Sequence, residues 1–428
     1  MAQEKNIKRE RLAEMAKISS DMKYINFNIN VLHLELTSRC NALCPMCART
    51  TGLDHDGELL KKRDDLDLID TDPQMLADML EQMKPFLPNH VFINGNFGDP
   101  IMYPHLMEVI KMYREAGVAQ ITLSTNGSAQ TAEWWTELAT VMRKPDKVIF
   151  AIDGLEDTNH LYRVNTTWSV IMRNAKAFID NGGIARWDFI GFAHNEHQVE
   201  EARQLADDMG FVTFRYKKSN RYVIPKDYSA DPDTPLEEET LVKKTEIKFV
   251  AKQHVAKAKK QAKTEEEKTK ALETILAAPK KVQSNTSEKV EQVLKKHKTF
   301  ENYVATTEID CQTSKDKSIF IDYKGKVWPC CWQGHYYSAI GEDKGSQRRI
   351  DDRVDLENKY GKDFNDLSKN NIFEILNSQY FSNDLVQSWQ PDQQRLYICG
   401  KTCGKELDFR GNGKQNFEDT EMNEYAKE

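Results

Sequence analysis

The sequence has no apolar run long enough to cross a bilayer. Its 428 residues are 39% hydrophobic and 30% charged, and the longest apolar candidate, Val148–Ile152, is far shorter than the roughly 20 residues that a membrane helix needs. The charged N-terminus, Met1–Arg11, lacks the apolar stretch of a secretory signal. We therefore expect a cytoplasmic protein of two or three domains, with enough apolar residues for a buried core.

Cysteine is absent from the 263 residues between Cys47 and Cys311. All eight cysteines fall into two clusters outside this gap, namely Cys40, Cys44, Cys47, Cys311, Cys330, Cys331, Cys399 and Cys403. Core cysteines would be scattered, and a disulfide-stabilised secreted domain would be shorter. Clustering in a chain without a secretory signal predicts metal binding in a reducing compartment.

Arginine and aspartate are both missing from residues 243–298, which we call the Lys-rich insert. It holds sixteen Lys and seven Glu, a net charge of +9, and leaves −16 on the rest of a chain whose total is −7. The composition predicts two helices or a helical hairpin. This segment serves either as a solvated spacer or as a docking surface for an acidic peptide or protein partner. Lysine without arginine or interleaved aromatic residues argues against nucleic acid as a partner.

Strand-like and helix-like segments alternate from Val31 to Tyr216. The predicted strands are 31–36, 90–94, 120–124, 147–153, 186–193 and 211–216, and the predicted helices are 74–83, 105–113, 132–142, 170–179 and 197–209. This alternation is typical of a parallel sheet with helices outside it. Six units are too few for a closed eight-fold barrel, so the fold class is α/β with a partial (β/α)6 TIM-like barrel. In such barrels the chemistry lies at the C-terminal ends of the strands.

Composition divides the chain into five segments. Residues 1–28 are an N-terminal extension, 29–222 the partial barrel, 223–305 a linker with the helical Lys-rich insert, 306–408 a small α+β cysteine-rich domain, and 409–428 a polar tail. In the cysteine-rich domain we expect a β-hairpin around Lys324–Gly325, with strands 318–322 and 326–328, and a helix over 373–385.

The first cluster has the spacing Cys-x3-Cys-x2-Cys in Cys40, Cys44 and Cys47. Three soft thiolates in eight residues can hold three irons of a cubane cluster and leave the fourth iron open. A zinc site usually needs four ligands, and neither of the nearest histidines, His33 and His55, has a usual zinc spacing. The spacing therefore favours an open-site iron–sulfur cluster over zinc.

This loop after the first strand resembles that of the radical S-adenosylmethionine (radical SAM) enzymes, and the resemblance covers roughly residues 29–222. Further motifs follow in the family's order: Gly95–Pro100 after the second strand, Ser124–Gly127 after the third, and Ile152–Gly154 with Tyr162–Arg163 after the fourth. The resemblance implies a SAM-binding 4Fe–4S cluster on the three cysteines. It also implies contacts to SAM from Met46, Gly98, Asp99, Ser124, Asn126, Asp153 and Arg163, the arginine pairing with the SAM carboxylate.

Three positions depart from the family's usual pattern. Asp99 replaces a usual glutamate, Ala151 replaces a frequent serine, and Met46 replaces a frequent aromatic residue before the third cysteine. Asp99 can still accept a hydrogen bond, and Met46 can still pack on the adenine ring through its sulfur. Ala151 implies that one hydroxyl contact to SAM is missing.

The second cluster resembles the auxiliary-cluster domains called SPASM and their shorter form, twitch. The resemblance rests on the hairpin ending in Gly325-Lys-Val-Trp-Pro-Cys330-Cys331 and on the spacing of Cys399 and Cys403. A full SPASM domain generally needs seven or eight cysteines, and only five remain, which implies one auxiliary 4Fe–4S cluster. Its expected ligands are Cys311, Cys330, Cys399 and Cys403, with Cys331 as the spare, although either adjacent cysteine could turn inward. A structural zinc site is the alternative.

The resemblance implies a radical SAM enzyme of the oxidoreductase type. Such an enzyme takes an electron from a flavodoxin or ferredoxin, cleaves SAM to a 5′-deoxyadenosyl radical and abstracts a substrate hydrogen atom. The substrate remains open between oxidative modification of a peptide or protein and chemistry on a small molecule such as a sugar or alcohol. A general base is unassigned, with Asp188, His194 and Glu196 as candidates near the fifth strand, and a structural role is the favoured alternative for each. A non-catalytic iron–sulfur or zinc scaffold is the alternative outside enzymes.

Overall fold

A computed structural model describes residues 29–45, 47–50, 61–192, 194–218, 292–293, 295–338, 347–390, 395–407 and 417–421. The N-terminal extension, Met46 and all but the last few residues of the Lys-rich insert lie outside the described residues. Within the described ranges, no helix combines the length and the apolar composition that crossing a membrane requires. The chain forms two compact units, the first from residues 1–38, 68–122 and 304–405 and the second from 39–67, 123–303 and 406–428.

The first unit is built on a mostly parallel set of strands. They are β1 (Val31–Leu34), β2 (His90–Ile93), β7 (Ser318–Ile321) and β8 (Val327–Trp328). β1 pairs in parallel with β2 on one side and with β7 on the other, Val31 lying opposite both His90 and Ser318. β8 pairs with β7 in antiparallel fashion, which confirms the predicted hairpin. β8 forms an edge, so this part of the sheet does not close.

The helices of the first unit follow the strands. They are α2 (Pro73–Met83), η1 (Lys84–Phe86), η2 (Pro100–Met102), α3 (Leu106–Ala116), α12 (Gln312–Lys315), α13 (Cys331–Tyr337), α14 (Gln347–Tyr360), α15 (Ile372–Asn377), the π-helical η4 (Tyr380–Asp384), α16 (Leu385–Gln387) and α17 (Tyr397–Cys403). α2 starts as its sequence dictates, because Asp72 accepts a hydrogen bond from the Gln74 N–H at 2.9 Å and Pro73 occupies the first helical position. α3 ends at Gly117, whose φ of 101° is left-handed.

The second unit carries the other parallel strands. β4 (Lys147–Ala151), β5 (Ala185–Gly191) and β6 (Thr213–Lys218) pair in parallel in that order, and β9 (Phe417–Glu421) adds an antiparallel edge to β6. β3 (Gln120–Thr125) begins in the first unit and ends in the second. The six predicted strands are thus all present in an open, mostly parallel α/β arrangement, as predicted.

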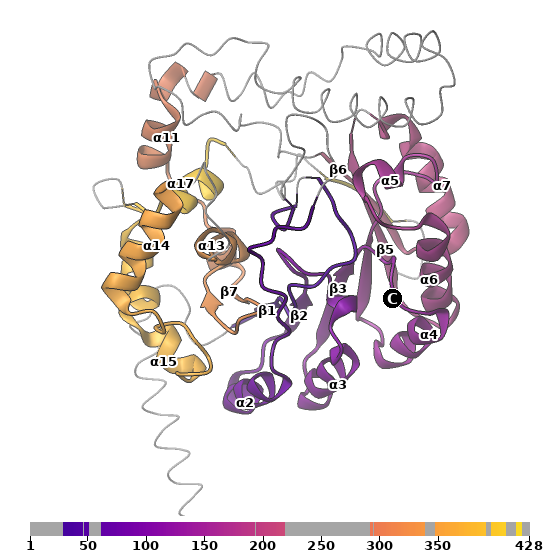
Figure 1. Ribbon diagram of the computed structural model, residues 1–428, viewed down its shortest axis with the longest axis horizontal. Helices are drawn as coiled ribbons and strands as arrows, with labels where there is room; N and C mark the ends of the chain where they lie inside the picture. Colours follow the sequence, from indigo (N-terminus) through magenta and orange to yellow (C-terminus); the bar gives the residue numbers. More distant parts are fainter. Residues whose placement is uncertain are drawn as a thin grey trace, which may run out of the picture. The chain divides into compact units, whose positions relative to one another are not determined.

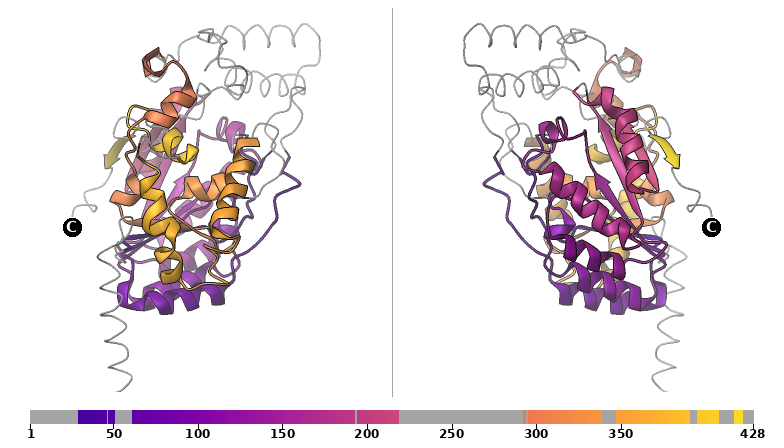
Figure 2. Two further views of the ribbon diagram at one scale, coloured as in Figure 1. Left: turned by 90° about the vertical axis from the view of Figure 1, so that its left-hand side faces the viewer. Right: turned by 90° about the vertical axis from the view of Figure 1, so that its right-hand side faces the viewer.

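Helices cover one face of the second unit's strands. α4 (Ala132–Val141), α5 (Asn159–Tyr162), α6 (Trp168–Asp180), η3 (Glu196–Gln198) and α7 (Val199–Met209) come from the connections between strands. α4, α6 and α7 lie in a layer outside β4–β6, as Figures 1 and 2 show. The core between them is aromatic, with Trp135 packed against Phe150 and Trp187 against Phe211. Burial of such rings stabilises this unit.

The structure differs from the sequence-based expectations in three places. β9 lies in the predicted polar tail, because residues 417–421 pair with β6. The single helix expected over 373–385 is divided into α15, η4 and α16. Finally, β7 extends the sheet beside β1, so the cysteine-rich domain and the start of the barrel share one unit. The helix α11 (Phe300–Thr306) leads into this region.

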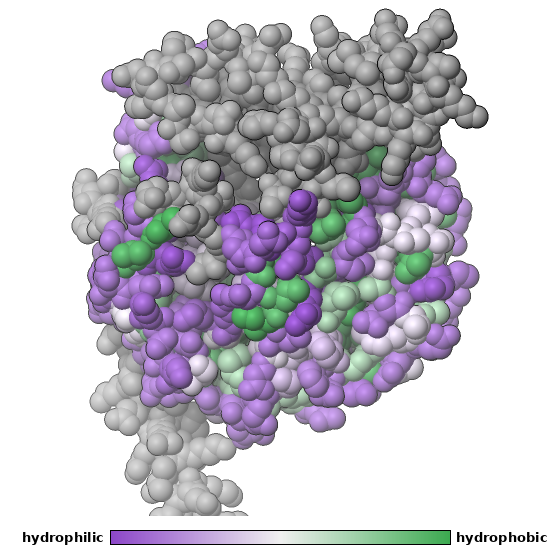
Figure 3. All heavy atoms as spheres, viewed as in Figure 1, coloured by the Kyte–Doolittle hydropathy of each residue, from purple (hydrophilic) through white to green (hydrophobic). Residues whose placement is uncertain are grey.

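Apolar side chains are mostly removed from the surface. Figure 3 shows a largely hydrophilic face with small hydrophobic patches among the coloured residues. Of the described residues, the exposed large hydrophobic ones are Leu68, Trp332 and Val354. Scattered exposure of this kind is ordinary for a folded protein.

Candidate active site

The three cysteines of the first loop meet around one apolar cluster in the second unit. Buried Cys44 packs with Ala42, Tyr162 and Phe192, and Cys40 and Cys47 pack against the same cluster. The loop turns back on itself because the Cys47 N–H donates to the Cys44 carbonyl at 3.0 Å. The sequence spacing therefore becomes a spatial cluster of three thiols in the loop that follows β1.

A buried arginine and a threonine hold the loop in this shape. Arg49 is 3% exposed, and its Nη1 donates to the carbonyls of Cys40 at 2.6 Å and Ala42 at 3.1 Å. The Thr50 hydroxyl donates to the carbonyls of Cys44 and Cys47. Sequence reasoning missed both residues. The only signal was their place two and three positions after the last cysteine.

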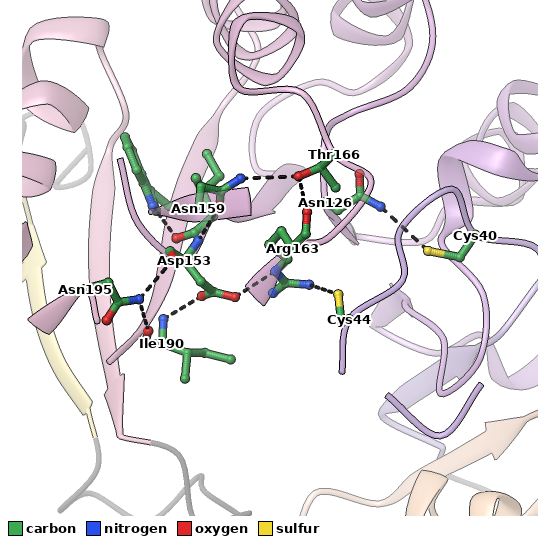
Figure 4. A network of polar contacts seen from close by, with 11 residues as sticks. Cys40, Cys44, Asn126, Asp153, Asn159, Arg163, Thr166, Ile190 and Asn195 are labelled. Carbon is green, nitrogen blue, oxygen red and sulfur yellow. Dashed lines mark hydrogen bonds and ion pairs between the residues drawn. The ribbon is translucent and has the colours of Figure 1, made fainter. Parts of the chain in front are cut away.

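Arg163 lies beside the loop and is oriented by Asp153 (Figure 4). Its Nε donates to Asp153 Oδ2 at 2.7 Å, and its Nη1 donates to Cys44 Sγ at 3.8 Å. Burial raises the pKa of the Cys44 thiol, and the nearby Arg163 charge acts against that rise. The guanidinium thus favours the thiolate form that an iron requires.

Asp153 forms hydrogen bonds and an ion pair with other residues of the chain. Its side chain is fully buried, and Oδ1 accepts a hydrogen bond from the Ile190 N–H at 2.7 Å while Oδ2 accepts from Arg163. Asn195 Nδ2 donates to the Asp153 carbonyl at 3.0 Å. The sequence interpretation gave Asp153 a contact with SAM. That contact stays a prediction, and the geometry shows in addition that the Asp153 carboxylate holds Arg163 in place.

Asn126 reaches the first cysteine from the end of β3. Its Nδ2 lies 3.7 Å from Cys40 Sγ and 2.9 Å from Asn41 Oδ1, and its Oδ1 accepts from the Ser128 N–H at 2.8 Å (Figure 4). Ser124, also predicted to contact SAM, lies half-buried within β3. Asn126 therefore joins the cysteine loop to the strand end, and its predicted contact with SAM stays a prediction.

The Gly95–Pro100 turn lies in the first unit and rests on a buried glutamate. Glu35 is 2% exposed, and its Oε1 accepts from the Phe97 N–H at 2.6 Å and the Gly98 N–H at 3.3 Å. A side chain at Gly95 would come within 2.8 Å of this carboxylate, so only glycine fits. Asp99 accepts from the Ile101 N–H at 3.2 Å and caps η2.

Burial raises the pKa of Glu35 to about 8, although the N–H groups of the turn act in the opposite direction. Its Oε2 has no hydrogen-bond partner among the described residues. Sequence analysis missed Glu35, and the available signal was an acidic residue within the alternating apolar pattern of 31–36.

The three general-base candidates do not converge. Asp188 forms ion pairs with Arg186, at 2.7 Å, and with Lys217. His194 is buried and stacks on Phe192 with ring centroids 5.2 Å apart, and burial raises the pKa of Glu196. Asp188 has a structural ion-pair role here, which favours the structural interpretation of that residue.

The second cysteine cluster forms a separate pocket within the first unit. Cys311, Cys330, Cys399 and Cys403, which we call the auxiliary cysteines, line one small cavity. Apolar side chains from Ile309, Leu385 and Ile398 complete its walls. Cys311 and Cys403 are hydrogen bonded through their thiols, which lowers the pKa of Cys311 to about 6 and raises that of Cys403.

The adjacent cysteines face different neighbours. Cys330 lies at the cavity and caps α13, its Sγ accepting from the Gln333 N–H at 3.5 Å. Cys331 lies instead beside Glu35, whose charge contributes to raising the pKa of the Cys331 thiol to about 12 after the larger effect of burial. This arrangement favours Cys330 over Cys331 as the ligand.

Both donor sets suit iron–sulfur clusters. The first offers three thiols, with a guanidinium and a carboxamide within reach of their sulfur atoms. The second offers four thiols around a common cavity with apolar walls. Thiolates are the ligands of cubane clusters, so a cluster with one open iron fits the first set and a fully ligated one fits the second.

Two family models match the chain. The model of the radical SAM superfamily matches residues 34–206, and that of an iron–sulfur cluster-binding domain, SPASM, matches residues 311–404. The first range contains the cysteine loop, Arg163 and Asp153. The second begins at Cys311 and includes all four auxiliary cysteines.

A curated relative matches part of the chain. The tungsten-containing aldehyde ferredoxin oxidoreductase cofactor-modifying protein of Pyrococcus furiosus is 31% identical over 124 residues, a match that covers 29% of this chain and 31% of that protein. The match thus spans about a third of the relative's length.

Among solved structures, Streptococcus suis SuiB bound to S-adenosylmethionine has 14% identity and a TM-score of 0.43, over 91% of this chain and 80% of that one. Native anSMEcpe with bound AdoMet has 13% identity and a TM-score of 0.44, over 87% of this chain and 88% of that one.

Proposed function

Because the chain belongs to the radical SAM superfamily and carries a C-terminal SPASM domain, we propose that this enzyme oxidatively modifies a peptide or protein substrate. The cofactors of this family are a 4Fe–4S cluster and SAM, and the SPASM domain adds auxiliary iron–sulfur ligation. The observation that carries the proposal is the convergence of Cys40, Cys44 and Cys47 beside an arginine fixed by a buried aspartate.

The chain's own residues prepare the site. Cys40, Cys44 and Cys47 would hold three irons of a 4Fe–4S cluster, which would leave the fourth iron open to the amino and carboxylate groups of SAM. Arg163 is held through its Nε by Asp153 and directs its Nη1 at Cys44, which leaves its Nη2 for the SAM carboxylate, a group that guanidinium geometry suits. When bound and reduced, the cluster supplies the electron that splits SAM into methionine and a 5′-deoxyadenosyl radical.

The turn at Gly95–Pro100 contributes a rigid backbone. Its N–H groups at Phe97 and Gly98 are fixed on Glu35, and the close approach at Gly95 excludes any side chain. As the resemblance to the family implies, we propose that the remaining backbone polar groups of the turn bind the amino group of SAM. Preorganised groups of this kind lower the cost of ordering the bound cofactor.

The oxidative part of the proposal rests on the auxiliary cysteines. Four thiols satisfy all four irons of a cubane, so a cluster held there has no open iron for substrate. Such a cluster would be suited to accept the electron that a substrate radical loses while a proton leaves to solvent, and the two losses together would oxidise the substrate. We further propose a flavodoxin or ferredoxin as the electron donor for the first cluster.

The peptide or protein substrate is supported by the charge of the chain. The Lys-rich insert carries +9 in a chain of net −7, a distribution suited to an acidic peptide or protein. The name of the Pyrococcus relative supports a second candidate, modification of a small cofactor.

Product analysis separates the two substrates. The reconstituted protein, SAM and dithionite are incubated either with a set of synthetic acidic peptides or with small alcohols and sugars, and masses are recorded. The peptide proposal predicts a peptide that has lost two hydrogen atoms, together with 5′-deoxyadenosine, and no such product from the C40A/C44A/C47A variant. If only a small molecule lost hydrogen, the peptide proposal would be wrong and the second candidate would replace it. A failure of every mixture to give 5′-deoxyadenosine would favour a non-catalytic scaffold.

A further inference from the structure

Gln333 is a buried polar residue that touches two of the auxiliary cysteines. It lies in α13, which packs beside α17 (Figure 1), and its side chain is 2% exposed. Its carboxamide Nε2 donates to Cys399 Sγ at 3.4 Å, and its backbone N–H donates to Cys330 Sγ at 3.5 Å. One residue therefore directs two N–H groups at the sulfur atoms of two different cysteines.

The orientation of the Gln333 carboxamide is fixed from behind. The Tyr380 hydroxyl donates to Gln333 Oε1, so the oxygen faces Tyr380 and the NH2 group faces Cys399. Tyr380 is itself buried and packed against the rings of Tyr360 and Phe364. The hydroxyl, carboxamide and sulfur form a chain in which each group orients the next.

Such a chain has an electrostatic consequence for a metal cluster. Hydrogen bonds to the sulfur ligands stabilise the reduced cluster, which is one electron more negative, and so raise its reduction potential. The cavity walls are largely apolar, which strengthens each N–H dipole that remains. The Trp389 side-chain N–H and the charge of Arg395 also favour the Cys399 thiolate, and both residues are retained when Gln333 alone is changed.

We propose that Gln333, oriented by Tyr380, is a positioning residue that raises the reduction potential of the auxiliary cluster and so equips it to accept an electron from the substrate. The inference rests on the proposed function, because it requires a cluster on the auxiliary cysteines. It adds a determinant of the potential that lies outside the cysteine ligands.

The test is a redox titration followed by electron paramagnetic resonance. Q333M keeps the length of the side chain and the backbone N–H to Cys330 but removes the N–H that faces Cys399. Y380F keeps Gln333 and removes only the group that orients it. Y360F is the matched control, because its hydroxyl belongs to the same aromatic cluster but bonds to Asp384. Each variant is titrated with both clusters present and again in a C40A/C44A/C47A background, which isolates the auxiliary signal.

We expect Q333M to shift the auxiliary midpoint to a clearly more negative potential, Y380F to shift it less in the same direction, and Y360F to match the native protein. Unchanged potentials in Q333M and Y380F, with full iron content, would overturn the inference. If Q333M does not take up the auxiliary cluster, the potential measured for Y380F decides the test. About four irons in the native protein, rather than the roughly eight of two cubane clusters, would instead refute the auxiliary cluster and with it the inference.

Discussion

Replacing Glu35 by glutamine is expected to remove a pH-dependent weakness of the native protein. The carboxyl group is buried beneath the 95–98 turn, and burial raises its pKa from 4.5 to about 8. The Phe97 and Gly98 N–H groups oppose this rise, and the nearby charge of Asp322 adds to it. E35Q keeps an oxygen that can accept from both N–H groups and carries no charge at any pH.

The direction in which the free energy of unfolding changes with pH follows from the number of protons that the folded and unfolded states bind. Between pH 4.5 and about 8 the folded protein keeps a proton on Glu35 that the unfolded chain has lost, so the free energy of unfolding falls as pH rises through this window. The contribution is fully present below pH 4.5 and is lost above pH 8. At about 1.4 kcal/mol per pH unit, the two pKa values correspond to a loss of about 4–5 kcal/mol across the window.

The assay is anaerobic urea denaturation of the cluster-loaded protein at about pH 5, pH 7 and pH 9, followed by fluorescence. The difference between E35Q and the native protein should grow in favour of E35Q as pH rises, by up to about 4–5 kcal/mol. E201Q, at an exposed position of α7, is the control and should follow the native curve. Parallel curves for E35Q and the native protein would refute the assignment of a protonated, buried Glu35.

Three further changes test the two cysteine sites. D153A leaves the buried Arg163 charge without its partner. We expect a free energy of unfolding about 3–5 kcal/mol lower in thermal denaturation and weaker SAM binding in calorimetry. A SAM affinity equal to that of the native protein would contradict the positioning role. C330A should lower the iron content by about four atoms per chain while C331A leaves it unchanged, and the reverse result would make Cys331 the ligand. R49M removes two hydrogen bonds to the first loop, worth about 1–3 kcal/mol in a buried site. The variant should therefore lose iron to a chelator faster than the native protein. An unchanged rate of iron loss would show that the loop holds its shape without Arg49.

Much of the fold was predictable because its signals are local. Alternating apolar patterns located β1 to β6, and helical spacing of apolar residues located the helices between them. The pairing of β7 with β1 was not predictable, because Val31 and Ser318 are brought together only by the tertiary fold. The same holds for β9, whose polar sequence gives no strand pattern of its own.

In the candidate site, too, some residues were predictable from local sequence and others were not. Cysteine spacing identified the first loop because three thiolates must lie close along the chain to share one cluster. Glu35 and Gln333 were not found from the sequence because their roles depend on the groups that surround them in the folded protein. A glutamate in a strand and a glutamine in a helix are ordinary until a turn or a sulfur atom lies against them. Asp153 was found by its motif, but its support of Arg163 was not, because the ion pair between them depends on the tertiary fold.

The central claim is that Cys40, Cys44 and Cys47 hold a cluster that cleaves SAM, separate from a second cluster on the auxiliary cysteines. Its most direct test is anaerobic reconstitution followed by iron counting and by quantification of 5′-deoxyadenosine after dithionite and SAM are added. The native protein should hold about eight irons and form 5′-deoxyadenosine, and C40A/C44A/C47A should hold about four and form none. Continued formation of 5′-deoxyadenosine by the triple variant, or the loss of all its iron, would contradict the claim.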